Sequence, residues 1–177
     1  MTSPSVPVHH QLRTHTAAAH ARLDAALGGA LCTGADYAAY VRGMATFLAG
    51  AATVLGGSHP LLTGSHAALS ADIGAPLPDF AGEPDPDRAR RIGWEYVVSG
   101  STLGAQLLLR DVRRRGYHRD VDNCFLAGFG ASDAWPGFLR GLQQVQLDGA
   151  ARLRACSAAL EAFHCAEQAL IDHRIPA

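Results

Sequence analysis

Hydrophobic positions recur along this chain at spacings of three and four residues, and they do not alternate as they would in a strand. In the first segment, residues 8–27, the repeating positions are Leu12, Thr16, Ala19, Leu23 and Leu27. Residues 34–55 have the same pattern, and a glycine pair follows each of the two segments. Alanine and leucine are abundant while β-branched residues are sparse, which also favours helices. We therefore predict an all-α protein.

Start and stop signals predict a third helix and a long fourth one. Pro60 begins the third helix, which ends near Gly74, where a stretch with four prolines starts. That stretch is too short to be a tether between domains, so we expect a surface connection. Asp85 or Asp87 can then cap a long helix that continues to Arg115.

The last third of the chain is predicted to contain one loop and two helices. Residues 117–132 have no sustained helical periodicity, and we predict a loop there. Asp133 is expected to be the N-cap of the next helix, and Asp148 that of the last one, which runs from about Gly149 to His173.

Length, charge and cysteine content limit the classes of protein to consider. The chain has 177 residues, a length typical of one domain. We predict that residues 1–7 are a disordered N-terminal segment and that residues 8–177 form a single domain. With 15 basic and 16 acidic residues the net charge is −1, so we expect no nucleic-acid partner and no anionic membrane. No segment has the uncharged run of about 18 residues typical of a membrane span. The four cysteines form no C-x-x-C pair, and we expect a monomer in a reducing cytoplasm.

Two glycines, Gly100 and Gly104, lie within the long predicted helix. Each should cost about 1 kcal/mol relative to alanine, so the helix is either bent there or presents bare backbone to something that comes very close. Residues four apart lie on the same face of a helix, one turn above the other. The two glycines therefore predict the floor of a groove.

His20 is the residue of the first helix that could carry chemistry. We place it on the buried stripe, where an ordinary histidine would be hydrogen-bonded within the core. Asp24 could accept a hydrogen bond from Nδ1 of His20 and leave Nε2 free to bind a metal. Arg13, seven residues earlier, lies about 10 Å along the axis and could reach the anionic edge of a flat ligand.

Two motifs resemble those of a known family. Residues 12–24, LRTHTAAAHARLD, are similar to the proximal-helix pattern of haem oxygenases, and residues 96–105, YVVSGSTLGA, are similar to their distal-helix pattern. The order and separation of the motifs match the bacterial, biliverdin-producing members. The resemblance covers roughly residues 9–165, and it is weaker over residues 116–142, where the family often has F-x-x-G-[YF]-G before a helix that begins with an aromatic.

This resemblance implies a helical haem-oxygenase-like bundle with a glycine-kinked distal helix, in which His20 ligates the haem iron. Gly100, Ser101 and Gly104 would then form the catalytic distal wall. The further haem contacts that it implies are Arg13, Thr16, Asp24, Tyr96, Leu103 and Arg110. The reaction would convert haem b, both substrate and cofactor, to biliverdin, Fe²⁺ and CO with O₂ and an external electron donor such as a ferredoxin and its reductase.

Several positions depart from the family pattern or have a simpler interpretation. Ser101 stands where mammalian members have an aspartate, and its hydroxyl could instead bond to the carbonyl four residues earlier. For Arg110 an ordinary solvated surface charge is the favoured interpretation. The terminal helix keeps Phe163 but lacks the other aromatics common in bacterial members.

Two other functions remain open from the sequence. A haem carrier or sensor of the same fold would keep His20 and the groove but would not degrade haem. A non-haem di-iron oxygenase would use Glu161-x-x-His164, although such a site needs further carboxylates and the chain has only four glutamates.

Overall fold

The computed structural model describes residues 7–27, 31–116 and 123–173, and within these ranges all regular structure is helical. The N-terminal segment predicted to be disordered, residues 1–7, lies almost entirely outside the described residues. The helices are α1 (Val8–Leu27), α2 (Gly34–Leu55), α3 (Pro60–Ile73), α4 (Arg88–Arg115), α5 (Cys124–Gly130), α6 (Ala134–Gln143) and α7 (Gly149–Asp172). The prediction of an all-α protein is confirmed.

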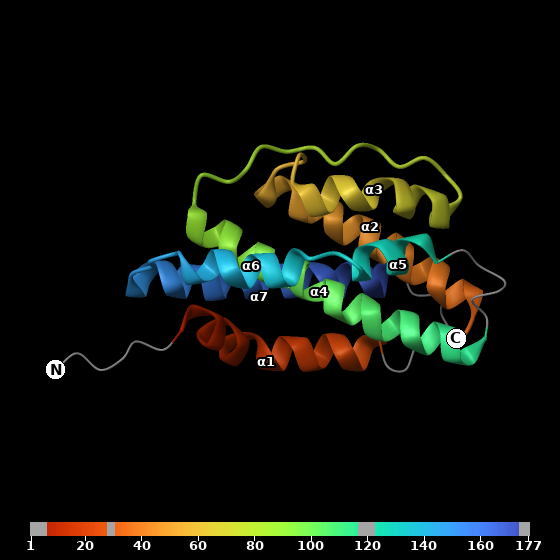
Figure 1. Cartoon of the computed structure of the whole chain (residues 1–177), viewed down its shortest axis with the longest axis horizontal. Coiled ribbons are helices and arrows are strands. Elements are labelled where there is room, and N and C mark those ends of the chain that lie inside the picture. The colour runs from red at the N-terminus through yellow and green to blue at the C-terminus, as the bar shows by residue number, and fades with distance from the viewer. Residues whose placement is uncertain (1–6, 28–30, 117–122, 174–177) are drawn as a thin grey trace.

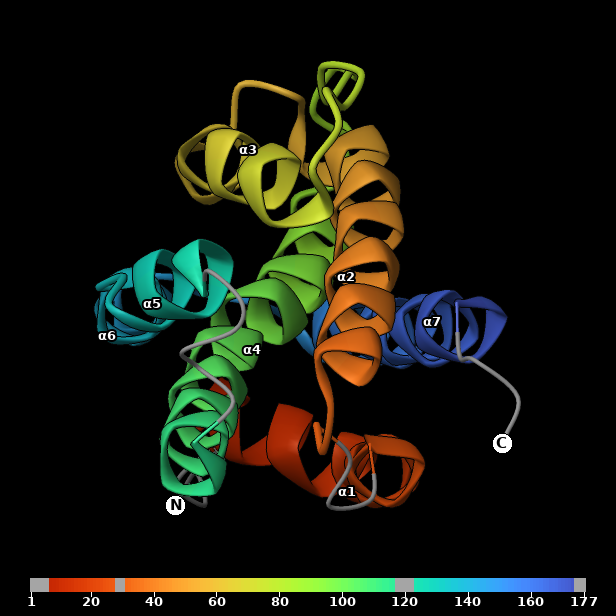
Figure 2. The ribbon, with the colours of Figure 1, turned by 90° about the vertical axis from the view of Figure 1, so that its right-hand side faces the viewer.

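The long helix α4 is the centre of the arrangement. It packs against α7, α5, α6 and α2, whereas α1 packs mainly against α7. In Figure 2, α4 runs from the upper middle of the molecule to its lower left, with α2 on its right, α3 at the upper left and α1 at the bottom. The C-terminal half of α4 lies on the same lower side as α1 in both views (Figures 1 and 2). The helices that contain the two family-like motifs therefore share one side of the bundle.

Local signals fix most helix ends. Thr33 and Asp36 form a capping box before α2, in which each side chain accepts a hydrogen bond from the other's backbone N–H. The carboxylates of Asp87 and Asp148 accept from first-turn N–H groups at 2.9 and 2.7 Å, as predicted. Asp133 occupies the N-cap position of α6, but its side chain makes no capping hydrogen bond.

Small residues let α4 and α7 approach closely. A Cβ atom built on Gly93 would overlap the carbonyl oxygen of Ala155 and would lie 2.7 Å from the Cβ of Ala158. On the α7 side of the contact, the buried residues are mostly alanines. This contact fixes the distance between the two helices, because neither backbone has room for a larger side chain.

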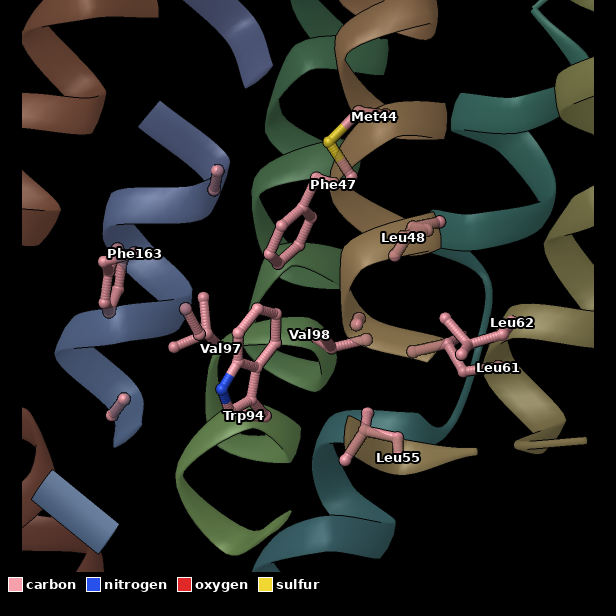
Figure 3. Close-up of a cluster of buried hydrophobic side chains, with 14 of the residues drawn as sticks. Met44, Phe47, Leu48, Leu55, Leu61, Leu62, Trp94, Val97, Val98 and Phe163 are labelled. Atoms are coloured by element: carbon pink, nitrogen blue, oxygen red, sulfur yellow. The ribbon is translucent and has the colours of Figure 1, made fainter. Parts of the chain in front are cut away.

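Larger side chains fill the space between α2 and α4. Phe47 and Trp94 stack with ring centroids 6.3 Å apart, and Figure 3 shows them beside Val97 and Val98. All four side chains are buried. The apolar face of α4 that includes Trp94 therefore belongs to the core.

The predicted loop over residues 117–132 is wrong in part, because Cys124–Gly130 forms the helix α5. The carboxylate of Asp72, about fifty residues earlier, accepts hydrogen bonds from the backbone N–H groups of Cys124 and Phe125 at 3.1 and 2.8 Å. The hydroxyl of Tyr37 donates to the same carboxylate. Since these partners are distant in sequence, local signals could not predict this helix.

Helix α2 is more apolar than we predicted, because we expected no segment with the composition of a membrane span. By length and composition, Gly34–Leu55 could cross a membrane, with a mean hydropathy of 1.3 over its most apolar window. In the structure 67% of that window is buried. Packing in the core of the bundle accounts for its composition.

The proline-rich connection between α3 and α4 is attached to the end of α2. Gly57 donates its N–H to the carbonyl of Gly82 at 2.9 Å, and Asp85 donates its N–H to the carbonyl of Val54 at 2.8 Å. Gly82 has φ of 147°, and a Cβ atom there would overlap the carbonyl of Ala52. The prediction of a surface connection is confirmed, and its backbone is held at defined points.

Candidate functional site

His20 lies at the surface of α1, so its placement on the buried stripe is wrong. Its side chain is 62% exposed, whereas the buried residues of α1 are Val8, Leu12, Thr16 and Ala19. These residues form a narrow arc because α1 packs mainly against one neighbour, α7. His20 follows Ala19 by about 100° around the helix and therefore falls at the edge of that arc. Its ring makes a T-shaped contact with Phe163 of α7, with centroids 5.8 Å apart.

The predicted contact between His20 and Asp24 is present. Nδ1 of His20 and Oδ2 of Asp24 are 2.9 Å apart, and both side chains are mostly exposed. Among the described residues, none forms a hydrogen bond with Nε2 of His20. The pair therefore has the arrangement that suits a histidine ligand, with one ring nitrogen oriented by a carboxylate and the other available.

One face of α4 presents bare backbone and apolar side chains to the solvent. A Cβ atom built on Gly104 would meet nothing within 4 Å, and Leu103 and Leu107 are 42% and 62% exposed. We call Gly100, Leu103, Gly104 and Leu107 the open strip of α4, of which Gly100 is the half-buried end. Helical structure continues through both glycines, so bare backbone is observed while the expected kink stays a prediction.

Two arginines predicted to contact a ligand are free of ion pairs within the described part of the chain. Arg13 of α1 and Arg110 of α4 are both exposed, and neither has a carboxylate of a described residue within ion-pair distance. By contrast, Arg22 of α1 is 3.5 Å from Glu167. Arg13 and Arg110 are therefore available for an anionic group at this side of the bundle.

Two hydroxyl groups of the predicted site are already used within their own helices. Thr16 is buried, and its hydroxyl donates to the carbonyl of Leu12 at 2.9 Å. Ser101 donates to the carbonyl of Val98 at 2.7 Å, three residues earlier rather than the expected four. Both hydroxyls have the ordinary role of helix residues that bond back to the backbone.

An aromatic cluster lies beside the open strip, formed by Tyr96, Trp135 and Phe138. Trp135 contacts Tyr96 edge to face at 5.6 Å and stacks on Phe138 at 5.8 Å. Of the three residues, only Tyr96 was a predicted site residue. Trp135 and Phe138 were missed as site residues, although the aromatic start of this helix belonged to the weaker part of the resemblance.

A cavity lies on a different face of α4. It has a volume of about 420 Å³ and is lined by residues that include His59, Glu95, Ser99 and Phe138. Nδ1 of His59 is buried without a hydrogen-bond partner among the described residues, and its Nε2 lies 4.0 Å from Glu95. Glu95 and Ser99 are each about 100° around the helix from Tyr96 and Gly100. None of the open-strip residues and neither His20 nor Asp24 lines this cavity, although Phe138 of the aromatic cluster does.

The residues proposed for a di-iron site do not converge. Glu161 forms an ion pair with Arg90 at 2.5 Å, and Arg90 also binds Asp85 at 2.6 Å. In the described ranges, no group of three or more histidine, cysteine, aspartate or glutamate side chains could hold a metal ion. Glu161 thus has a structural role in joining α7 to α4.

The fold is similar to that of a solved haem oxygenase. The structure of the NO- and CO-bound enzyme from Neisseria meningitidis superposes with a TM-score of 0.71 and 20% sequence identity, over 96% of this chain and 92% of that one. No family model and no curated protein matches the sequence. At this identity the similarity concerns the arrangement of the helices. The chain therefore has the haem-oxygenase fold.

Proposed function

We propose that this protein is a haem oxygenase, which converts haem b to biliverdin, Fe²⁺ and CO. The observation that carries the proposal is that α1, which bears the His20–Asp24 pair, lies on the same side of a haem-oxygenase fold as the C-terminal half of α4, which bears Gly104 and Leu107 (Figure 2). The His20–Asp24 pair supplies an available imidazole nitrogen, and the open strip supplies an apolar surface that has no side chain at Gly104. A flat ligand with a central metal and an apolar periphery fits both features.

The residues of α1 would hold such a ligand from one side. Nε2 of His20 is the proposed iron ligand, and the carboxylate of Asp24 fixes the orientation of the ring through Nδ1. Arg13 and Arg110 are the proposed partners of the two propionates. Their guanidinium groups suit carboxylates because they offer paired N–H donors.

The residues of α4 would act from the other side. The absent side chain at Gly104 lets the helix backbone come close, while Leu103 and Leu107 would exclude water from the periphery of the ligand. When bound, haem supplies the iron at which O₂ is activated, with electrons from an external donor such as a ferredoxin and its reductase. We also propose that the protein is a monomer in the cytoplasm and that it binds neither a membrane nor nucleic acid.

A haem carrier or sensor is the second candidate, and one observation favours it. The hydroxyl of Ser101 donates to Val98, so this residue does not direct a proton towards the open strip. Oxygen activation needs a proton source at that point. For Ser101 to help deliver protons, its O–H group must rotate away from Val98.

Titration with hemin tests the proposal. We expect one equivalent to give a Soret band that is strongly altered in His20→Ala and unchanged in His15→Ala, because His15 is an exposed histidine of the same helix whose ring bonds to Gln11. With a reductant and catalase, the wild-type band should decay to a biliverdin spectrum. A band that stays stable would favour the carrier, and an unaltered band in His20→Ala would exclude His20 as the ligand.

A further inference from the structure

The position of Trp135 is fixed by two other aromatic rings. It contacts Tyr96 of α4 with an interplanar angle of 62°, and it stacks on Phe138, one turn later in α6, with an angle of 25°. Tyr96 and Phe138 also contact each other at 6.1 Å. Phe138 is buried, so the cluster is attached to the core. Three mutually contacting rings leave Trp135 little freedom to change its rotamer.

Trp135 covers one end of the open strip. Two atoms of its six-membered ring, Cζ3 and Cε3, lie 3.6 and 3.8 Å from the position that a Cβ atom of Gly100 would occupy. That is ordinary van der Waals contact, so the indole ring already lies against this glycine. At Gly104, one turn further along, no atom lies within 4 Å of the corresponding position. The bare backbone is therefore accessible at Gly104 and covered at Gly100.

We propose that Trp135 is a specificity-determining residue that limits how far a planar macrocycle can move along α4 towards Gly100. The inference rests on the proposed function, because it concerns how haem would be seated against this chain. The indole ring is the side wall, and Leu103 and Gly104 are the surface on which the macrocycle would lie. Trp135 would thereby select which bridging carbon of the macrocycle lies nearest to Gly104.

The physical reason is that the four bridging carbons of haem are chemically similar. The protein can select one of them only through a contact that changes when the macrocycle shifts or rotates within its own plane. A rigid wall at one end of the strip supplies such a contact by steric exclusion, independently of the charges at Arg13 and Arg110. Its removal should widen the range of positions without removing the iron ligand.

The test compares Trp135→Ala and Trp135→Phe with the wild type and with Phe80→Ala. Phe80 serves as the matched control, because it is a partly buried aromatic that contacts His66 of α3 and lies outside the aromatic cluster. Biliverdin isomers from hemin turnover would be separated by chromatography. We expect Trp135→Ala to lower the ratio of the major isomer to the others about tenfold, which corresponds to about 1.4 kcal/mol. Trp135→Phe should give an intermediate ratio, and Phe80→Ala the wild-type ratio.

A second measurement does not depend on turnover. In the ferric hemin–cyanide complex, the proton NMR shifts of the haem methyl groups report the in-plane seating of the macrocycle. The methyl pattern of Trp135→Ala should differ from that of the wild type while His20 remains bound. Trp135→Phe keeps an aromatic ring and provides the test if the alanine variant does not fold.

The outcomes separate the two proposals. A wild-type isomer ratio and a wild-type methyl pattern in the Trp135 variants would overturn the role of Trp135 and leave the proposed function intact. A wild-type protein that does not bind hemin would overturn the proposed function, and this inference with it. Loss of hemin binding in folded Trp135→Phe would assign Trp135 to retention of the ligand and contradict its role in selection.

Discussion

The hydrogen bond between His20 and Asp24 lies at the surface, so it matters for orientation more than for stability. Both side chains are mostly exposed, and exposed pairs of this kind contribute little to the free energy of unfolding. The carboxylate does, however, restrict the imidazole ring to one direction. Under the proposed function, that restriction favours binding of iron at Nε2.

We therefore predict that Asp24→Ala weakens hemin binding about 10–100-fold, the usual effect of losing a carboxylate that orients a histidine ligand. The dissociation constant can be measured from the Soret band. Urea unfolding should give nearly the same free energy as for the wild type. Glu83→Gln is the control, since Glu83 is an exposed acid away from α1. Equal hemin affinity in the wild type and Asp24→Ala would contradict the orienting role.

Tyr37 gives a prediction about alkaline pH. Burial above all, and then its hydrogen bond to Asp72, raises the pKa of Tyr37 above the ordinary value of about 10. In the unfolded chain the phenol ionises near that ordinary value. The stability that the neutral phenol contributes is therefore fully present below about pH 10 and is lost as the pH rises further.

Tyr37→Phe should lower the free energy of unfolding at pH 7 by about 1 kcal/mol, because one hydrogen bond is lost while Asp72 keeps its two backbone donors. The variant should lose less stability than the wild type between about pH 9 and 11. Urea titrations across this range measure both effects. Parallel pH profiles would show that Tyr37 does not contribute to the alkaline loss.

Residue-level contacts differ in how well the sequence predicts them. The spacing of His20 and Asp24 predicts their contact, because residues four apart on any helix are neighbours. The exposure of His20 depends on where α7 lies, and periodicity in α1 does not contain that information. The contact between Trp135 and Gly100 is long-range for the same reason, and a local motif cannot indicate it.

At the level of helices, local capping and stop signals predicted the observed bounds closely. The bounds of α1 and α2 match the prediction, and Asp87 caps α4. The missed helix is α5, whose N-terminal N–H groups bond to Asp72 and whose phenylalanines lie in the core. A seven-residue helix is too short to be stable by itself, so tertiary contacts stabilise it.

Two glycines of α4 should respond oppositely to the same substitution. Gly93→Ala would force a methyl group into the backbone of α7, and we expect a net loss of about 1–2 kcal/mol despite the helix propensity gained. Gly104→Ala meets open space and should raise the free energy of unfolding by up to about 1 kcal/mol. Urea unfolding of both variants measures the difference. Two changes of the same sign would contradict the described helix contact or the open strip.

For the molecule as a whole, the haem-oxygenase fold followed from two short motifs, although overall identity to the solved neighbour is 20%. The motifs lie on the two helices that share one side of the bundle. For the rest of the chain, the fold requires only helices of suitable length and small residues where helices pack closely, as at Gly93. Many sequences meet those requirements, so they carry little family signal.

A ligand that binds only the folded chain should stabilise all of it. Hemin at about 100 times its dissociation constant should add about 2.7 kcal/mol to the free energy of unfolding. For a domain of this size, Tm should rise by about 5–11 °C. His20→Ala should show a smaller rise at the same hemin concentration, and differential scanning calorimetry measures both. An equal rise in both proteins would indicate hemin binding elsewhere on the chain.

The attachment of the proline-rich connection to α2 has a consequence for hydrogen exchange. The amide hydrogens of Gly57 and Asp85 are outside the helices, yet both are bonded to backbone carbonyls. We expect them to exchange with deuterium at rates close to those of core helical amides, whereas the amide of Glu83, an exposed residue of the connection, should exchange quickly. Opening at these two points would require the connection to separate from the C-terminal end of α2. Exchange at these two amides, followed by mass spectrometry or NMR, would therefore report on how tightly the connection is held against α2.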